Sequence, residues 1–524
     1  MRIGIDVGGT HTDAVLLDGD CILATHKSLT TADVESGIMA ALSALLQTSK
    51  VDKSQIQSIM IGTTQFTNAV VERKELAEVA IIRIALPSGN GFPPLSDWPD
   101  DIADAVGRHI YLCHGGYLYD GHPLAPLNDS EIDDIITDIR AKGLTNVAIA
   151  SAFSSMNPEP EHYVAAKLQA AIPGVNLTLS HRIGSLGLLE RENAAILNTA
   201  LLPFAQRVVE AFHSALREHG FGCPMFISQN DGTLMSADFV KQYPALTFAS
   251  GPTNSLRGAY KLTGLQDAIV VDIGGTTSDI GVLQNGFPRE SNLVVSVGGV
   301  RTNFRMPDIQ AVGLGGGSLV SEDGNRVGPQ SVGHRLVQEG LVFGGSTLTA
   351  TDIVVAAGLA GVGDPTLVSH LSPALIENAR ASMQTLIDQN IDMMKPNAEP
   401  VPVILVGGGA ILIQDGLQAA STLVRPEHAG VANAIGAAIA QVGGEAEALK
   451  SYSSNGRQQA IDDVTGEARQ RAIAAGADAA TIRVADIEET EVPYMEQGVY
   501  RLRVKVIGEV ATLPGSQSLR EQRA

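Results

Sequence analysis

A short polar motif between two apolar strands occurs twice in this chain and constrains its fold more than any other feature. The first copy, within residues 2–16, contains Asp-Val-Gly-Gly-Thr-His-Thr-Asp, and the second, within residues 269–283, contains Asp-Ile-Gly-Gly-Thr-Thr-Ser-Asp. A polar turn between two apolar runs predicts a strand–turn–strand hairpin. Because the copies lie about half of the 524-residue chain apart, they predict two related halves.

The chemistry of the motif favours phosphate binding. Glycines let backbone N–H groups approach a ligand closely, and a concave run of N–H groups beside hydroxyls suits phosphate oxygens. The candidate nucleotide-binding residues are Gly8, Gly9, Thr10 and Thr12 in the first copy and Gly274, Gly275, Thr276 and Thr277 in the second. A third glycine turn, Gly407, Gly408 and Gly409, follows the apolar run 403–406 and is a candidate site for adenosine.

The leading aspartates of the two copies are the candidate metal ligands. Asp6 and Asp272 each end a predicted strand, where one or two carboxylate oxygens can hold a hydrated Mg²⁺. If the two hairpins face each other across a cleft, both aspartates have catalytic and metal-binding roles toward ATP. The alternative is an Asp that binds the N–H groups of its own turn, which we favour for Asp13 and Asp279. His11, inside the first loop, is a weaker candidate for a ligand contact.

Composition excludes several classes of function. A net charge of −21 leaves no basic surface for nucleic acid, and no apolar run reaches the ~18 residues needed to span a bilayer. The three cysteines are scattered and form neither a metal motif nor a disulfide framework. We therefore expect a cytoplasmic protein with no nucleic-acid or membrane partner.

The order of predicted elements indicates an α/β protein with a mainly parallel, doubly wound sheet. Residues 186–219 read as a long helix that Pro203 kinks or splits. We expect three parts: an N-terminal domain over 1–185, a second domain over 186–445, and a small α+β region over 446–524 with a disordered tail. Thr31 or Asp33 is the expected cap of a helix that ends at Leu46.

Taken together, these segments resemble a known family. The two hairpins are similar to the phosphate motifs of the actin, sugar-kinase and heat-shock chaperone ATPases, and the glycine triplet to their adenosine motif. Within that superfamily, the chain resembles the hydantoinase A/5-oxoprolinase group. The matching segments are 62–69, 190–193, 250–252, 298–302, 313–318 and 432–437. The resemblance implies an actin-like (ribonuclease H-like) ATPase fold, with two related α/β domains around a nucleotide cleft.

The resemblance also implies an activity. Members of this group hydrolyse a cyclic amide, such as a hydantoin, 5-oxoproline or another lactam, with ATP and Mg²⁺ as cofactors. The ATP-binding chain often works with a separate B-type subunit, and we expect a homo-oligomer as well. Glu190 is a candidate catalytic residue, because it shares a helix face with Asn193; the alternative for residues 190–193 is a solvated charged face.

Two departures leave the substrate open. Where many relatives have a His after Asp-Ile, this chain has Gln310. The segment 328–334 begins as the corresponding segment of the family does, but it lacks the residues that follow in the better-known members. His181 and His334 are further candidates, and at Asp352 a helix cap competes with a functional role. The alternative function is a small-molecule kinase, or a non-catalytic ATPase switch that acts on a partner protein.

Overall fold

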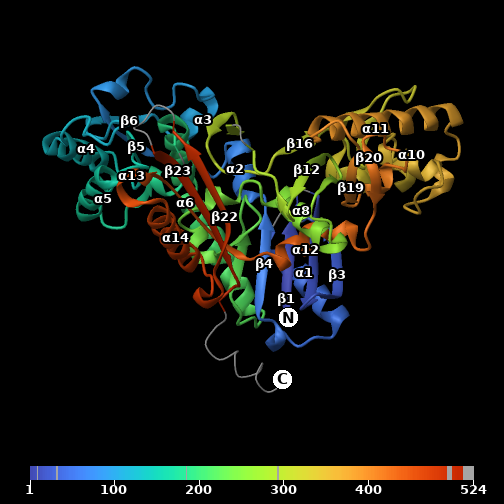
Figure 1. Cartoon of the computed structure of the whole chain (residues 1–524). Helices are drawn as coiled ribbons and strands as arrows, with labels where there is room; N and C mark the ends of the chain where they lie inside the picture. Colours follow the sequence, from blue (N-terminus) through green and yellow to red (C-terminus); the bar gives the residue numbers. More distant parts are fainter. Residues whose placement is uncertain (9, 31–33, 185, 292–293, 493–497, 512–524) are drawn as a thin grey trace.

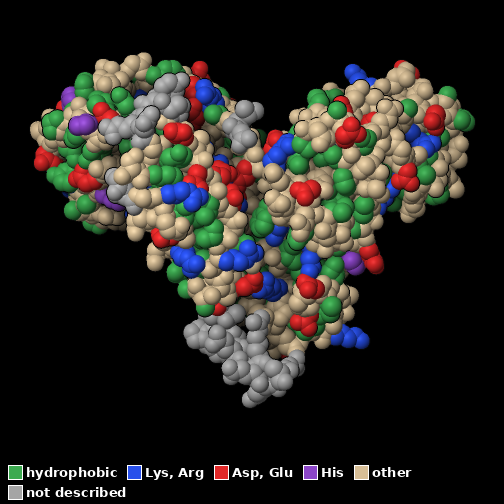
Figure 2. Space-filling view, in the orientation of Figure 1, with side chains coloured by type: hydrophobic (Ala, Val, Ile, Leu, Met, Phe, Trp, Pro, Cys, Tyr) green, Lys and Arg blue, Asp and Glu red, His purple; other side chains and the backbone are tan. Residues whose placement is uncertain are grey.

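The computed structural model describes residues 1–8, 10–30, 34–184, 186–291, 294–492 and 498–511. The chain forms two arms that rise from a common base (Figure 1), and Figure 2 shows a deep notch between the arms. The expected caps Thr31 and Asp33, the start of the strand expected from Leu293, and the tail beyond residue 511 lie outside the described residues.

The largest sheet contains the first hairpin and has the strand order β22-β23-β21-β10-β9-β4-β1-β2-β3. Its strands are β1 (Arg2–Val7), β2 (His11–Asp18), β3 (Cys21–Leu29), β4 (Ser58–Thr63), β9 (Met225–Ser228), β10 (Leu234–Ser236), β21 (Val442–Ser451), β22 (Arg483–Glu491) and β23 (Val499–Gly508). Strand β1 pairs with β2 in antiparallel and with β4 in parallel orientation, and β4 pairs with β9 in parallel.

The second hairpin lies in a six-stranded sheet with the order β13-β12-β11-β19-β20, in which β16 also pairs with β12. Its strands are β11 (Ala268–Ile273), β12 (Ser278–Gln284), β13 (Phe287–Pro288), β16 (Ile309–Val312), β19 (Val401–Val406) and β20 (Ala420–Val424). An antiparallel hairpin followed by two parallel strands repeats the pattern of the first sheet. The expected duplication of α/β halves is therefore confirmed.

A third sheet of four parallel strands, in the order β6-β5-β7-β8, is inserted after the first hairpin. Its strands are β5 (Ala80–Leu86), β6 (His109–His114), β7 (Asn146–Ser151) and β8 (Asn176–Leu179). Helix α4 (Asp129–Ala141) connects β6 to β7, and helix α5 (Glu159–Ala171) connects β7 to β8. Helix α4 begins where Asn128 accepts hydrogen bonds from the N–H groups of Ser130 and Glu131.

The sheets group the chain differently from the expected boundaries at residues 185 and 445. Strands β9 and β10 follow the first boundary but join the first sheet, and β21 crosses the second boundary. The C-terminal strands thus extend the nine-stranded sheet, with α14 (Arg457–Ala474) packed against β21 and β23. The three-domain division stays a proposal.

Helix α6 (Leu188–Glu218) is continuous through Pro203, so the expected split is wrong. Buried residues lie on both sides of this proline, from Leu201 to Val209, and their packing outweighs one lost backbone hydrogen bond. The remaining elements are α1 (Val34–Ser49), α2 (Gln65–Glu72), α3 (Asp100–Ala105), α7 (Ala237–Val240), α8 (Ser250–Thr263), α9 (Leu336–Glu339), α10 (Ala350–Ala356), α11 (Pro373–Met394), α12 (Ala432–Ile439), α13 (Tyr452–Asn455), β14 (Val295–Val297), β15 (Val300–Thr302), β17 (Ser318–Val320) and β18 (Val327–Ser331).

Helices α8 and α12 cross between the two repeated halves, with α12 against β1 and β2. Small residues set the separation of these helices. A Cβ added to Gly436 would overlap the backbone carbonyl of Asn254, and one added to Gly258 would overlap the carbonyl of Ala432. The helices therefore touch backbone to backbone, which fixes the position of α8 beside the first hairpin.

We expect Gly436→Ala to lower the free energy of unfolding by about 1–3 kcal/mol, the usual effect of overpacking a filled contact. Gly466→Ala is the matched control: this helical glycine is exposed, and an added Cβ meets nothing within 4 Å. The control should be neutral or stabilising by up to about 1 kcal/mol. Urea unfolding measures both; equal stability of the two variants would contradict the close crossing.

Candidate nucleotide site

The two hairpin turns have the same internal geometry. In the first, Gly8 N–H donates to the carbonyl of His11 at 3.0 Å, and in the second, Gly274 N–H donates to the carbonyl of Thr277 at 2.9 Å. The N–H groups of Gly8 and Gly274 are therefore used inside the turns. Within the described ranges, the N–H groups of Gly275 and Thr276 donate to no other residue and are free to bind an anion.

The tips of the two turns lie against each other. A Cβ on Gly275 would be 3.3 Å from both Oγ1 and Cγ2 of Thr10, so residues from opposite halves of the chain are in contact here. Thr12 is buried and its hydroxyl lies 3.3 Å from that of Thr30, which donates to the carbonyl of Gly8. Gly9, a predicted member of this group, lies outside the described residues.

Asp6 is held in a buried position by amides from both connecting helices. Its two carboxylate oxygens accept hydrogen bonds from Asn254 Nδ2 at 3.1 Å and from Asn433 Nδ2 at 3.0 Å. Burial, and after it the nearby charges of Asp13 and Asp272, raise the pKa of Asp6 to about 7 against the lowering effect of the amides. The carboxylates of the two halves therefore act on one another.

Asp272 occupies the equivalent place in the second half. Its Oδ2 accepts a hydrogen bond from Ser255 Oγ at 2.5 Å, and burial raises its pKa. Each aspartate also lies beside a glycine at the end of the neighbouring parallel strand, Gly62 within β4 and Gly407 directly after β19. A Cβ on Gly62 would collide with Asp6 Oδ1, and a Cβ on Gly407 would collide with Asp272 Oδ1. The same packing arises twice from the duplicated sheet.

Among the described residues, neither Asp13 nor Asp279 accepts a hydrogen bond from its own turn, so the turn closure that we expected for them is not seen there. Each lies directly across its hairpin from the leading aspartate, which places like charges side by side. Asp13 binds Lys27 Nζ at 2.6 Å, and Lys27 also donates to the carbonyl of Gly430. The pKa of Asp279 is raised to about 7, first by burial and then by Asp272. Four carboxylates and one lysine thus gather at the base of the hairpins.

The donor set at this point fits a hydrated Mg²⁺. Among the described residues no three His, Cys, Asp or Glu side chains form a metal-binding group, but Mg²⁺ is typically held by one or two carboxylates and keeps its waters. Asn254 Oδ1 is buried beside Asp6 and accepts no hydrogen bond from a described residue. Asp6 and Asp272 would hold the ion, and Asn254 can accept from its water.

The raised pKa of Asp6 predicts a pH-dependent stability. Since its pKa in the folded protein, about 7, lies above the ordinary aspartate value of 3.8, the buried carboxylate destabilises the fold increasingly as pH rises from about 4 to about 7. We expect Asp6→Asn to gain about 2 kcal/mol over wild type between pH 5 and pH 8. Urea unfolding in EDTA measures this difference in the free energy of unfolding between the variant and wild type. A difference that does not change with pH would contradict the buried carboxylate.

The third glycine turn lies beside the second hairpin. Gly409 N–H donates to the carbonyl of Ile273 at 2.7 Å, and Gly407 N–H donates to the carbonyl of Ala429 at 2.9 Å. Gly408 faces the Lys27 side chain, with a Cβ position 3.8 Å from Lys27 Cε. The turn is therefore placed next to Asp272, while its role toward adenosine stays a proposal.

Residues 190–193 form no solvated charged face, because Arg191, Glu192 and Asn193 are buried. Glu190 pairs with Arg301 at 3.0 Å, and Asn193 donates to the backbone carbonyl of the same Arg301. The two side chains share a face, as expected, but no interaction among the described residues joins Glu190 to the aspartate pair. Its catalytic role stays a proposal.

Two further candidates have structural partners. His181 Nδ1 lies 2.6 Å from the buried Glu161. Asp352 completes a capping box with Thr349 at the start of α10, so the cap explains this residue. His334 is exposed in a short 3₁₀ turn.

Four residues of the site were not predicted from the sequence: Asn254, Ser255, Asn433 and Lys27. The first two follow the segment 250–252 and Asn433 lies within 432–437, both of which carry the family resemblance. Since no charge or spacing marks an amide as a partner of a carboxylate 248 or 427 residues away, only the fold reveals these roles.

Comparison with known proteins gives a consistent picture. Residues 2–172 match the hydantoinase/oxoprolinase N-terminal region and residues 191–363 match the hydantoinase/oxoprolinase region. The chain is 25% identical over 394 residues to the caprolactamase subunit alpha of Pseudomonas jessenii, and 27% identical over 397 residues to the acetophenone carboxylase gamma subunit of Aromatoleum aromaticum. Each alignment covers 68% of this chain and 54% or 53% of the relative, so the chain spans about half the length of these proteins.

The crystal structure of the ATP-dependent caprolactamase from Pseudomonas jessenii has the same fold, with a TM-score of 0.77 at 19% identity over 98% of this chain and 88% of that one. No helix among the described residues is long and apolar enough to cross a membrane.

Proposed function

Since the chain belongs to the hydantoinase/oxoprolinase family, we propose that it binds one ATP with Mg²⁺ between its two hairpins and uses it to open a cyclic amide. The observation that carries this proposal is the meeting of the duplicated turns, Gly275 against Thr10, above the buried Asp6 and the half-buried Asp272. Free N–H groups for phosphate and carboxylates for a hydrated cation then lie at one place. The names of the similar caprolactamase subunit and of the similar caprolactamase structure, both from Pseudomonas jessenii, support the choice of reaction.

The chemistry requires activation, because an unstrained amide is a poor electrophile. Transfer of the γ-phosphoryl group to the amide oxygen gives an imidate-like carbon and releases ADP. Water then adds to that carbon, the C–N bond breaks, the ring nitrogen takes a proton and phosphate leaves. Mg²⁺ would neutralise charge on the phosphates during transfer.

The chain's own residues would position the reactants. Asn254 and Asn433 hold the Asp6 carboxylate in one orientation, and Ser255 does the same for Asp272. Fixed carboxylates and N–H groups need no reorganisation when charge develops, which is the main contribution of a protein to phosphoryl transfer. Lys27, next to Asp13 and the Gly408 backbone, is placed to balance phosphate charge.

A separate B-type subunit is part of the proposal. Two relatives are named as subunits of larger enzymes, an alpha subunit and a gamma subunit. We expect the chain alone to hydrolyse ATP slowly and to open a ring only with its partner, in a complex that also contains more than one copy of this chain.

Carboxylation is the second candidate, because one relative is a carboxylase subunit. The same cleft would then phosphorylate a different oxygen atom. The required co-substrate distinguishes amide hydrolysis from carboxylation, because a carboxylase consumes ATP only with bicarbonate and a ketone.

The test is a screen of ADP release by the chain with its co-purified partner. We expect hydantoin, 5-oxoproline or a larger lactam to stimulate release in step with a ring-opened product. Stimulation by bicarbonate and a ketone alone would support the carboxylase, and a stable phosphorylated product would support a kinase.

A further inference from the structure

A cavity of about 150 Å³ lies away from the hairpins, where the carboxyl ends of three strands meet. Ser155 follows β7, His181 follows β8, and Asn230 follows β9. The first two strands belong to the four-stranded parallel sheet and the third to the nine-stranded sheet. Open α/β sheets bind ligands outside the carboxyl ends of their strands, so the location itself favours a binding site.

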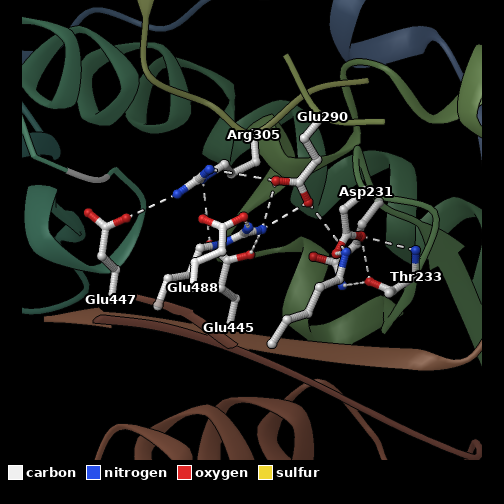
Figure 3. Close-up of polar contacts among 10 residues, drawn as sticks. Asp231, Thr233, Glu290, Arg305, Glu445, Glu447 and Glu488 are labelled. Carbon is white, nitrogen blue, oxygen red and sulfur yellow. Dashed lines mark hydrogen bonds and ion pairs between the residues drawn. The ribbon is translucent and has the colours of Figure 1, made fainter. Parts of the chain in front are cut away.

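One wall of the cavity contains a network of ion pairs in which three cations, Arg305, Arg503 and Lys505, contact five carboxylates, those of Asp231, Glu290, Glu445, Glu447 and Glu488 (Figure 3). Arg305 Nη2 binds Glu447 at 3.0 Å, and Arg503, only 3% exposed, binds Glu445 at 2.6 Å. Lys505 binds Asp231 at 2.7 Å. Buried charges persist only when paired, so the carboxylates of this wall are already satisfied and do not call for a cationic ligand.

Two polar groups that face the cavity remain available. Arg182 is exposed, lines the cavity, and forms no ion pair or hydrogen bond with a residue of the described ranges. The Ser155 hydroxyl is buried and has no hydrogen-bond partner there either. A buried polar group without a partner in the protein is uncommon and needs an explanation. An anion that reaches both groups would supply one.

One side of the lining is apolar and limits the size of the ligand. Ile183 and Phe304 are buried, and Tyr243 and Leu246 complete this side. A cavity of about 150 Å³ accommodates a molecule of the size of benzene. The ligand therefore combines one negative charge with a compact apolar body.

We propose that this cavity binds a small monocarboxylate with a ring-sized apolar body, with its carboxylate on Arg182 and the Ser155 hydroxyl. The site is separate from the nucleotide site, since neither hairpin turn nor the third glycine turn contributes to its described lining. The inference therefore does not depend on the proposed enzymatic reaction.

Benzoate is the probe, titrated into the full chain by calorimetry without nucleotide. We expect one saturable site per chain. Benzamide, which has the same shape without the charge, and acetate and phosphate, which lack the apolar body, should each bind at least about tenfold more weakly. Binding of benzamide or phosphate as tight as that of benzoate would overturn the proposal.

Substitutions in the cavity lining test whether benzoate binds there. Arg182→Gln should weaken benzoate binding at least about tenfold, and Ser155→Leu, which fills the cavity, should abolish it. Arg140→Gln, an exposed arginine on α4, is the matched control and should leave binding unchanged. If Ser155→Leu fails to fold, Arg182→Gln decides alone. Equal loss in the Arg182 and Arg140 variants, or loss of benzoate binding in Asp272→Asn, would contradict the cavity as the site.

Discussion

Replacement of Asp272 by Asn is expected to lower the rate of ATP hydrolysis at least about 100-fold. The substitution keeps the shape of the side chain and its contact with Ser255 Oγ but removes one of two opposed carboxylates. Loss of one preorganised charge-stabilising group typically costs 10²–10³ in rate. Steady-state ADP release at saturating Mg²⁺ measures the effect.

The fold should survive this change. Because burial raises the pKa of Asp272, its charge opposes folding, and Asp272→Asn should melt at the wild-type temperature or above it at pH 8. Asp18→Ala is the matched control, since this exposed carboxylate ends β2 of the first hairpin and should leave the rate unchanged. An Asp272→Asn enzyme within about tenfold of wild type would refute the assignment.

Replacement of Glu192 by Ala is expected to destabilise the chain by about 3–5 kcal/mol. Glu192 accepts two hydrogen bonds from Arg83, at 2.8 Å from Nε and 2.5 Å from Nη2, and both side chains are 2% exposed. Removal of one partner leaves a buried guanidinium uncompensated. Arg83 also donates to the carbonyls of Gly89 and Phe92, so the loop after β5 should loosen too.

The neighbouring Glu190→Ala is the control for this prediction. Its partner Arg301 is 58% exposed, and such pairs contribute about 0–1 kcal/mol. Chemical denaturation measures both variants. Equal effects of the two substitutions would show that the Arg83–Glu192 pair is not the link between α6 and the four-stranded sheet.

The repeat could be predicted from the sequence because its signals are local. A polar Gly-Gly turn between apolar runs specifies a hairpin, and its recurrence specifies two related sheets, which the pairing of β1 with β4 and of β11 with β19 confirms. The position of Asp6 and Asp272 at strand ends followed from the same pattern.

The features that could not be predicted from the sequence depend on packing between residues far apart in the chain. The C-terminal strand β23 joins the first sheet through β21, and no local signal marks such a partner. A solvated charged face remained an alternative for residues 190–193, because charge alone cannot distinguish solvation from burial against a distant arginine such as Arg83. Pro203 predicted a kink or a split, and the packing around α6 keeps the helix unsplit.

One measurement tests the central claim, that two duplicated hairpins hold a single nucleotide between them. Calorimetric titration of the chain with Mg–ATP should give one site per chain. Asp6→Asn and Asp272→Asn should each weaken this site, although they belong to opposite halves of the chain. Two sites per chain, or a site that only one of the two substitutions affects, would contradict the shared cleft.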